Sequence, residues 1–176
     1  MPANKTILVV EDNEINRLML SELLSLEYTV LEAENGQQAL DVLEKRKDEI
    51  SLILLDITMP VMDGYTFLSI AKADPALASI PVIVTTQSDS EADEVAALSH
   101  GATDYVAKPY KPQIIRHRVA SIIHLRETAA MINQFQYDRL TSLYSKEFFY
   151  QRVRETLRQN PGRNYSVSYT HLTLPT

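Results

Sequence analysis

Residues 52–68 read LILLDITMPVMDGYTFL and contain the clearest structural pattern of the sequence. It begins with four apolar residues, a run of the length of a buried strand, and Asp56 follows the run directly. Asp63 and Gly64 then lead into a segment in which apolar side chains recur at helical spacing. The stretch therefore predicts a strand, a turn and an amphipathic helix, in that order.

Apolar runs and helical patterns alternate in the same way along the rest of the chain. The runs that we expect to form strands cover residues 6–10, 29–33, 52–55, 82–85 and 105–107. Asn13 can cap the first helix, and Asn35 precedes the second. Pro75 ends the third helix, and Gly101 can take the left-handed conformation that ends the fourth, which starts near residue 90. Strands that alternate with helices predict an α/β fold with a parallel sheet.

A fifth helix is predicted to begin at Pro112 and to run to about residue 135. About 24 residues at 1.5 Å each span about 36 Å, which is more than one small sheet can cover. An approximate heptad seam follows this helix and consists of Ile115, Ile122, Leu125, Ala129 and Ile132. The seam favours a coiled-coil connector in the distal half. The alternative is an amphipathic helix that folds back on its own domain.

The composition of the 176 residues is that of a globular protein, with 45% apolar and 23% charged residues. This length suits one domain and a fragment better than two complete domains. The sequence has no cysteine, which excludes disulfides and thiolate metal sites. A net charge of −6 without a basic stripe disfavours direct nucleic-acid binding. Because we find no signal-peptide core and no run near the roughly 20 apolar residues of a membrane span, we expect a cytoplasmic protein.

Charged and hydroxyl side chains stand where the apolar runs end. Glu11 and Asp12 follow the first run, and Asp56 follows the third. Thr86 follows the fourth, and Lys108 follows the fifth. Each of them alone is ordinary for a loop, a helix cap or a surface lysine. Parallel strands end at a common edge, where open α/β sheets build their sites. The order and the complementary charge of these five side chains therefore together predict a site at that edge.

The three carboxylates predict a site for a divalent cation such as Mg²⁺. This ion prefers oxygen ligands and keeps several waters, so Glu11, Asp12 and Asp56 with one backbone carbonyl suffice. Clustered carboxylates repel one another, and a cation relieves this repulsion and neutralises an incoming phosphoryl group. An ionised Asp56 can then attack phosphorus in line and form an acyl phosphate. Lys108 would pair with one phosphoryl oxygen and Thr86 would donate to another.

Four strings, VVEDNEINR, LILLDITMPVMDGYTFL, IPVIVTTQS and GATDYVAKPY, closely resemble the motifs of bacterial response-regulator receiver domains, in the same order. The resemblance covers about residues 5–124. It implies a flavodoxin-like, doubly wound sheet of five parallel strands flanked by five helices, of which the last is extended. It also implies a signalling switch of a two-component system that accepts a phosphoryl group from a histidine kinase or a phosphotransfer protein.

The resemblance assigns roles to the residues of the cation site. By it, Asp56 is the phosphoacceptor, and Glu11 and Asp12 are the acidic pair that holds Mg²⁺. Thr58 is a further metal ligand through its carbonyl. Lys108 is the phosphate-binding lysine, and the Lys108–Pro109 peptide bond is expected to be cis.

The resemblance also assigns two switch residues. Thr86 corresponds to the switch hydroxyl, and Tyr105 to the aromatic side chain that turns inward on activation. The alternative for Tyr105 is an ordinary half-buried tyrosine of an edge strand. Gln87 departs from the family pattern, in which a small residue follows the switch hydroxyl. This departure puts the usual lifetime of the acyl phosphate, and its access to solvent, in doubt.

Residues 137–157, YDRLTSLYSKEFFYQRVRETL, resemble the opening of a GGDEF domain, the family that makes cyclic di-GMP from GTP. The residues that match its entry motif are Asp138, Leu140, Thr141 and Leu143. Ser142 stands where glycine is more usual. The alternative is a generic helix start that Thr141 caps. The metal-binding aspartates and the GGDEF turn that should follow are absent from the sequence, so we expect no cyclase activity from this chain.

The expected organisation has four parts: a receiver domain at 5–124, a helical linker at 125–136, a truncated GGDEF-like fragment at 137–167 and a non-native tail at 168–176. The main functional prediction is a phosphorylation-dependent switch that is no enzyme beyond its own phosphorylation and dephosphorylation. The alternative is a diguanylate cyclase response regulator with a truncated catalytic domain. A phosphatase with an aspartate nucleophile is discounted, because Thr58 stands where such enzymes carry a second acid. Phosphorylation is expected to favour a homodimer through the face of the fourth helix, fifth strand and fifth helix.

Overall fold

A computed structural model describes residues 5–87, 90–138, 141 and 143–163 of the chain. It divides into two compact units, Met1–Arg126 and Glu127–Thr176. Among the described residues, no helix has both the length and the apolar character to cross a bilayer.

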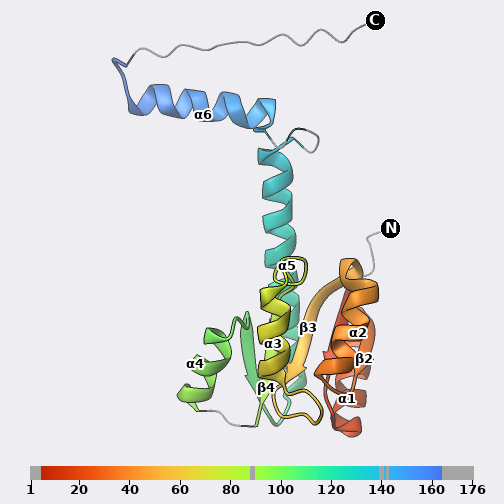
Figure 1. Ribbon diagram of the computed structural model, residues 1–176. Coiled ribbons are helices and arrows are strands. Elements are labelled where there is room, and N and C mark those ends of the chain that lie inside the picture. Colours follow the sequence, from red (N-terminus) through yellow and green to blue (C-terminus); the bar gives the residue numbers. More distant parts are fainter. Residues whose placement is uncertain (1–4, 88–89, 139–140, 142, 164–176) are drawn as a thin grey trace, which may run out of the picture. The chain divides into compact units, whose positions relative to one another are not determined.

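The described part of the first unit is built on one sheet of five parallel strands in the order β2-β1-β3-β4-β5 (Figure 1). The strands are β1 Thr6–Val10, β2 Thr29–Ala33, β3 Ile50–Asp56, β4 Val82–Thr86 and β5 Asp104–Ala107. This is the flavodoxin-like strand order, so the predicted fold class is confirmed. All five strands end at one edge of the sheet, which is the lower edge in Figure 1.

Three strands are longer than the apolar runs predicted. β3 begins at Ile50 and ends at Asp56, β4 ends at Thr86, and β5 begins at Asp104. Ile50 pairs with Thr6, and Thr86 pairs with Ala107. A strand ends where its ladder ends, and the ladder partners lie far away in the sequence. The apolar pattern alone therefore stops short of the true ends.

Five helices follow the strands of this unit: α1 Glu14–Ser25, α2 Gly36–Arg46, α3 Gly64–Ala73, α4 Glu91–Ser99 and α5 Pro112–Gln136, and the short 3-10 helix η1 Lys47–Glu49 extends α2. Asn13, Asn35, Asp63 and Ser90 cap the first four, each accepting a hydrogen bond from the backbone N–H three residues later. Gly101 follows α4 with a φ of +94°. The predicted helix starts are confirmed.

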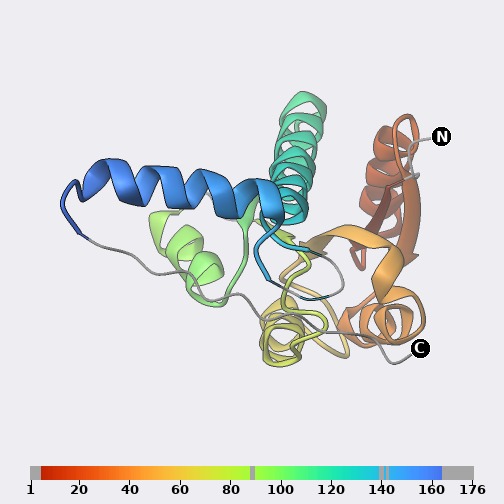
Figure 2. The same ribbon diagram turned by 90° about the horizontal axis from the view of Figure 1, so that it is seen from above.

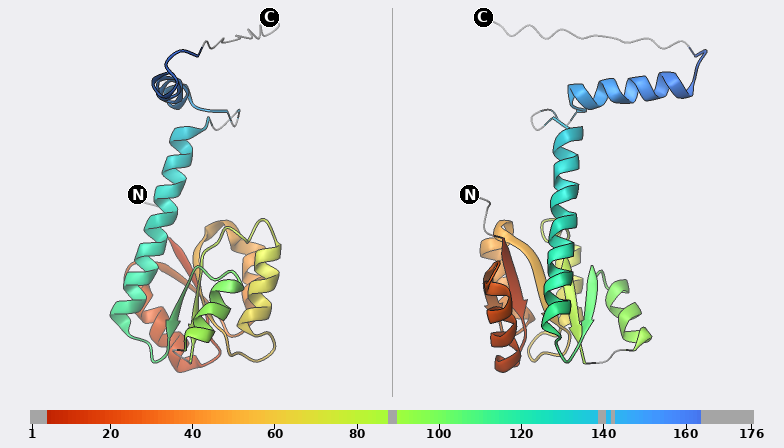
Figure 3. Two further views of the ribbon diagram at one scale, coloured as in Figure 1. Left: turned by 90° about the vertical axis from the view of Figure 1, so that its left-hand side faces the viewer. Right: turned by 180° about the vertical axis from the view of Figure 1, so that it is seen from behind.

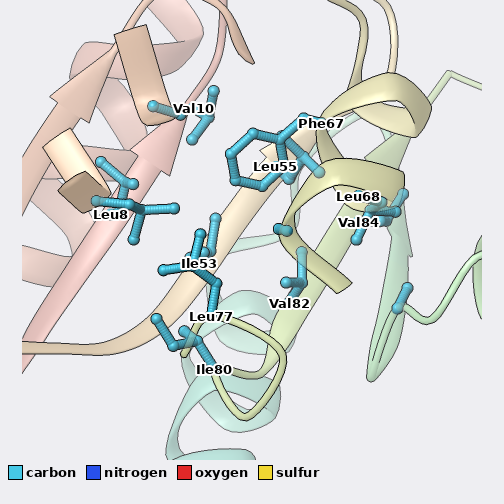
Figure 4. Close-up of a cluster of buried hydrophobic side chains, with 14 of the residues drawn as sticks. Leu8, Val10, Ile53, Leu55, Phe67, Leu68, Leu77, Ile80, Val82 and Val84 are labelled. Atoms are coloured by element: carbon cyan, nitrogen blue, oxygen red, sulfur yellow. The ribbon is translucent and has the colours of Figure 1, made fainter. Parts of the chain in front are cut away.

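The helices cover both faces of the sheet, because alternate residues of a strand point to opposite sides. Ile7 and Val9 of β1 pack with residues of α1 and α5, such as Leu20 and Val119. Leu8 and its neighbours on the other face pack with α2, α3 and α4. Figure 2 shows α1 and α5 on one side of the sheet and α2 and α3 on the other. Figure 4 shows the cluster that contains Leu8, in which Phe67 of α3 is fully buried against the strands.

Helix α5 is one unbroken helix in both views of Figure 3, although it crosses from the first unit into the second. Ile115 and Ile122, two members of the predicted heptad seam, are 1% and 8% exposed and pack on the sheet of their own unit. They are therefore not free to pair with another helix. Leu125 and Ile132 are 67% and 50% exposed. The coiled coil stays a prediction, confined to the distal half of the helix.

In the second unit, up to Arg163, none of the side chains whose burial the structure describes is buried. The unit contains the bridge between Tyr137 and Tyr144 and the helix α6 Lys146–Gln159. Ser145 caps α6, so the alternative in which Thr141 caps a helix is wrong. Thr141 instead donates to the carboxylate of Asp138. The predicted motif residues Leu140 and Ser142, and the expected tail at 168–176, lie outside the described residues.

Candidate functional site

Three carboxylates meet at the carboxyl edge of the sheet. Glu11 follows β1 and Asp56 is the last residue of β3, and the two are 1% and 2% exposed. Asp12 is exposed. One oxygen of each carboxylate lies within 4.8 Å of the others. The sequence predicted this convergence from three residues that lie up to 45 positions apart.

Lys108, which follows β5, joins two of these carboxylates. Its Nζ lies 2.6 Å from Asp56 Oδ2 and 3.0 Å from Glu11 Oε2. Burial opposes its charge, but the hydrogen bonds to Asp56 and Glu11 raise the pKa of Lys108 above its ordinary value. The ammonium group is therefore charged and shared between two buried acids.

The surroundings of the Asp56 carboxyl oppose its charge. Burial raises the pKa of Asp56, and the Glu11 carboxylate adds to the rise. Lys108 and the backbone N–H of Thr58, which donates to Oδ1 at 3.3 Å, act in the opposite direction. A cation near the three acids would favour the ionised form of Asp56. Three oxygen donors, of which one is exposed, fit the ligand chemistry of Mg²⁺.

Backbone contacts hold the two acid-bearing loops. The guanidinium of Arg17 donates to the carbonyls of Glu11 at 2.8 Å and Asp12 at 3.3 Å, and it pairs with Glu34 at 3.2 Å. After β3, a Cβ built at Gly64 would lie 2.5 Å from the carbonyl oxygen of Asp56. No side chain fits there without moving the Asp56 backbone. The sequence placed Gly64 at a helix start but gave no sign of this close approach.

The other predicted site residues lie around this centre. Thr86 ends β4 and is half-buried, and Thr58 is exposed two residues after Asp56. Tyr105 is half-buried on β5, and its ring centroid lies 5.8 Å from the guanidinium of Arg118. The Lys108–Pro109 peptide bond is cis, as expected.

An open pocket of about 490 Å³ lies beside the site. Its lining residues are Asn16, Met19, Gln87, Lys108, Pro109 and Tyr110. Gln87, the departure from the family pattern, is exposed on this pocket. Lys108 both lines the pocket and contacts Asp56, so its side chain links the pocket to the carboxylates.

Tyr110 is a site residue that the sequence reasoning missed. Its hydroxyl donates to Glu11 Oε2 at 2.5 Å and lies 2.9 Å from Thr85 Oγ1. Burial, followed by the hydrogen bond to Glu11, raises the pKa of Tyr110, so the hydroxyl keeps its proton. Its partners lie 99 and 25 residues away in the sequence. The one available signal was its position directly after Lys108 and Pro109.

Comparisons with known proteins show the family of this chain. Residues 7–120 match the family described as response regulator receiver domain. The transcriptional regulatory protein CpxR of Escherichia coli K12 is 40% identical over 121 residues, which are 68% of this chain and 49% of that protein. A probable cyclic di-GMP phosphodiesterase of Vibrio cholerae is 35% identical over 133 residues, which are 75% of this chain and 30% of that protein.

A solved structure shows the same fold. The receiver domain of the sensor histidine kinase PA1611 from Pseudomonas aeruginosa, with a magnesium ion coordinated in its active-site cleft, is 32% identical with a TM-score of 0.63. The match covers 69% of this chain and 99% of that one. The chain spans only 9% to 56% of the length of the first curated relatives that it matches. The family match over residues 7–120 is more than half of the chain, so this protein belongs to the response regulator receiver family.

Proposed function

We propose that Asp56 is the residue that a histidine kinase or phosphotransfer protein phosphorylates. Mg²⁺ would be held by the carboxylates of Glu11, Asp12 and Asp56 and by the carbonyl of Thr58. The observation that carries the proposal is the contact of Lys108 Nζ with Asp56 Oδ2 at 2.6 Å, inside a group of three acids. A buried aspartate between the Lys108 ammonium and two other acids has a perturbed pKa, and groups of this kind are common at functional sites.

The proposed reaction transfers a phosphoryl group from a donor histidine. An oxygen of Asp56 attacks phosphorus, an O–P bond forms and the P–N bond breaks. The electron pair of the broken bond stays on the imidazole nitrogen, which takes a proton from solvent. Lys108 pairs with one phosphoryl oxygen, and Thr86 donates a hydrogen bond to another. Bound Mg²⁺ supplies positive charge next to the transferred group.

Phosphate uptake tests the assignment of Asp56. The protein is incubated with acetyl phosphate and Mg²⁺, and the added mass is mapped to a peptide by mass spectrometry. Asp56→Asn should abolish the uptake, because the amide is a poor nucleophile. Asp48→Asn, which changes an exposed acid of η1, should leave it unchanged. Uptake that survives in Asp56→Asn would contradict the proposal.

The metal assignment ranks two acids. Both oxygens of Glu11 already accept hydrogen bonds from protein groups, whereas Asp12 is exposed. Asp12→Ala should therefore weaken Mg²⁺ binding more than Glu11→Ala does, as measured by titration calorimetry. Equal and negligible losses would mean that the acidic pair only supports the loop.

We also propose that phosphorylation favours a homodimer through α4, β5 and α5. Exposed apolar side chains support this surface: Val95 and Leu98 of α4 are 58% and 42% exposed, and Leu125 of α5 is 67% exposed. Sedimentation with and without a phosphate mimic tests it, and Val95→Asp should prevent the rise in mass. Ile15→Asp is the matched control, because Ile15 is 78% exposed on α1. An unchanged mass of the wild type would refute the dimer.

The alternative function is a cyclic di-GMP output after the receiver, with the parts at 5–124, 125–136 and 137–167 that the sequence predicted. The contact of Thr141 with Asp138 and the bridge between Tyr137 and Tyr144 support an ordered entry segment. The Vibrio cholerae relative is named for cyclic di-GMP cleavage, not synthesis. This chain, incubated with GTP and Mg²⁺, should give no cyclic di-GMP on chromatography. Product above a protein-free control would favour the cyclase.

The cytoplasmic location stays a prediction.

A further inference from the structure

A chain of hydrogen bonds runs through the site behind the carboxylates. Asn16 Nδ2 donates to Glu11 Oε1 at 3.1 Å, and the Tyr110 hydroxyl donates to Glu11 Oε2 at 2.5 Å. The hydroxyl oxygens of Tyr110 and Thr85 lie 2.9 Å apart. The four residues come from α1, the end of β1, the loop before α5 and β4. The chain thus joins four separate elements at the carboxyl edge.

The order of donors along this chain follows from proton counting. A phenol has one proton, and the short distance to a carboxylate directs it to Glu11. The Thr85 hydroxyl must then donate its own proton to the Tyr110 oxygen. Thr85 is 1% exposed and directly precedes Thr86. Both hydroxyl groups are satisfied in this order, and the Tyr110 ring is held at its polar end.

The Glu11 carboxylate depends on the hydrogen bond that the Tyr110 hydroxyl donates. Its side chain is 1% exposed, so water cannot easily replace a lost hydrogen bond, and a buried acceptor without a donor is unfavourable. Without the Tyr110 hydroxyl, Oε2 would keep only Lys108, which lies at 3.0 Å. Lys108 also serves Asp56 at 2.6 Å. The hydroxyl of Tyr110 therefore fixes the Glu11 carboxylate, so that Lys108, which also serves Asp56, is not the only donor to Oε2.

We infer that Tyr110 is a positioning residue of the cation site, which acts through the Glu11 carboxylate and touches neither the cation nor the phosphoryl group. This inference rests on the proposed function. It gives Tyr110 a role that its aromatic ring alone does not fill. The ring centroid lies 5.4 Å from Lys108 Nζ, and this contact survives in Tyr110→Phe. The substitution therefore removes the hydroxyl and keeps the ring.

The test is Mg²⁺ binding to the whole chain, measured by titration calorimetry without any phosphodonor. Tyr110→Phe should raise the Kd about tenfold, the loss expected when a partner that orients a metal-binding group is removed. Thr85→Val keeps the bond between Tyr110 and Glu11 and should raise the Kd less. Tyr28→Phe is the control, because Tyr28 precedes β2 at the opposite edge of the sheet. Thermal melting without Mg²⁺ checks that each variant is folded.

Two further readouts separate positioning from general support of the fold. In a Glu11→Ala background, Tyr110→Phe should add no further loss, because the two residues act through one bond. The half-saturating Mg²⁺ concentration for phosphate uptake should rise in Tyr110→Phe, while the rate at saturating Mg²⁺ changes less.

The outcomes are distinct. A wild-type Kd for Tyr110→Phe, or a loss that is equally large in the Glu11→Ala background, would overturn the inference while the proposed function stands. A larger loss in Thr85→Val than in Tyr110→Phe would also overturn it. A wild type that neither binds Mg²⁺ nor takes up phosphate would overturn the proposed function, and the inference with it.

Discussion

Helices α3 and α6 begin alike and differ in what surrounds them. Each has a side-chain cap, Asp63 for α3 and Ser145 for α6, and each carries phenylalanine in its first two turns. Phe67 of α3 is 0% exposed in the core, whereas Phe149 of α6 is 43% exposed. Caps and periodicity specify a helix, but its apolar face is buried only where another apolar surface packs against it. In the described residues, the sheet supplies this surface to α3, whereas α6 has only the rings of Phe135 and Tyr144 beside its Phe148.

The largest expected effect is on the two phenylalanines. Phe67→Ala should lower the free energy of unfolding by about 3–5 kcal/mol, because it leaves a cavity in a packed core. Phe149→Ala should lower it by less than about 1 kcal/mol. Urea unfolding followed by circular dichroism measures both. Equal losses would break the comparison, since α6 would then have a core of its own.

The next effect compares a buried ion pair of the first unit with an exposed ion pair of α6. Lys108→Met leaves the buried carboxylates of Glu11 and Asp56 without their cation and should cost about 3 kcal/mol in metal-free buffer. Arg152→Met breaks an exposed pair with Glu155 at 3.6 Å and should have no measurable effect. Added Mg²⁺ should restore part of the loss in Lys108→Met. A stable Lys108→Met protein without Mg²⁺ would mean that the acids tolerate one another.

A smaller effect should separate the two halves of α5. Ile123 is 4% exposed and Ile132 is 50% exposed on the same helix. Ile123→Ala should therefore cost about 2 kcal/mol, and Ile132→Ala less than about 0.5 kcal/mol. Hydrogen exchange of the slowest strand amides reports both values. A large loss for Ile132→Ala would reveal a packing partner for the distal half.

The smallest expected effect is a pH dependence of the α3 cap. Hydrogen bonds from the backbone N–H of Thr66 lower the pKa of Asp63. A lowered folded-state pKa means that the cap stabilises the fold above about pH 4, the usual carboxyl range, and that this part is lost as pH falls. Asp63→Asn keeps the acceptor without the charge and should flatten this slope between pH 7 and pH 3. Asp48→Asn should not. An unchanged slope would show that the cap does not depend on charge.

The sequence predicted the five strands and the five helix starts of the first unit correctly because each is encoded locally. Asn13 and Asp63 cap their helices through hydrogen bonds that span three residues. The ends of β3 and the role of Tyr110 were missed for the opposite reason. Ile50 belongs to β3 because it pairs with Thr6 of β1. Tyr110 contacts the site through Glu11, which lies 99 positions away in the sequence.

The site shows the same division. The convergence of Glu11, Asp56 and Lys108 followed from parallel strands with charged ends, which is a rule of topology. The sharing of Lys108 between the two acids did not follow, because it depends on side-chain conformations. The heptad spacing alone could not show which surface Ile115 and Ile122 pack on, since it fits a partner helix and the strand face beneath them equally well.

Gly64 limits how this protein can be engineered. Replacing a helical glycine by alanine is a common route to a more stable protein, because it narrows the conformations of the unfolded chain. At this position the added methyl group would lie 2.5 Å from the Asp56 carbonyl oxygen and 2.8 Å from Ile57 Cα. A stabilisation screen that replaces glycines by rule would therefore displace the backbone of Asp56. Gly64 should be held fixed in any library in which the response to a phosphodonor must be kept.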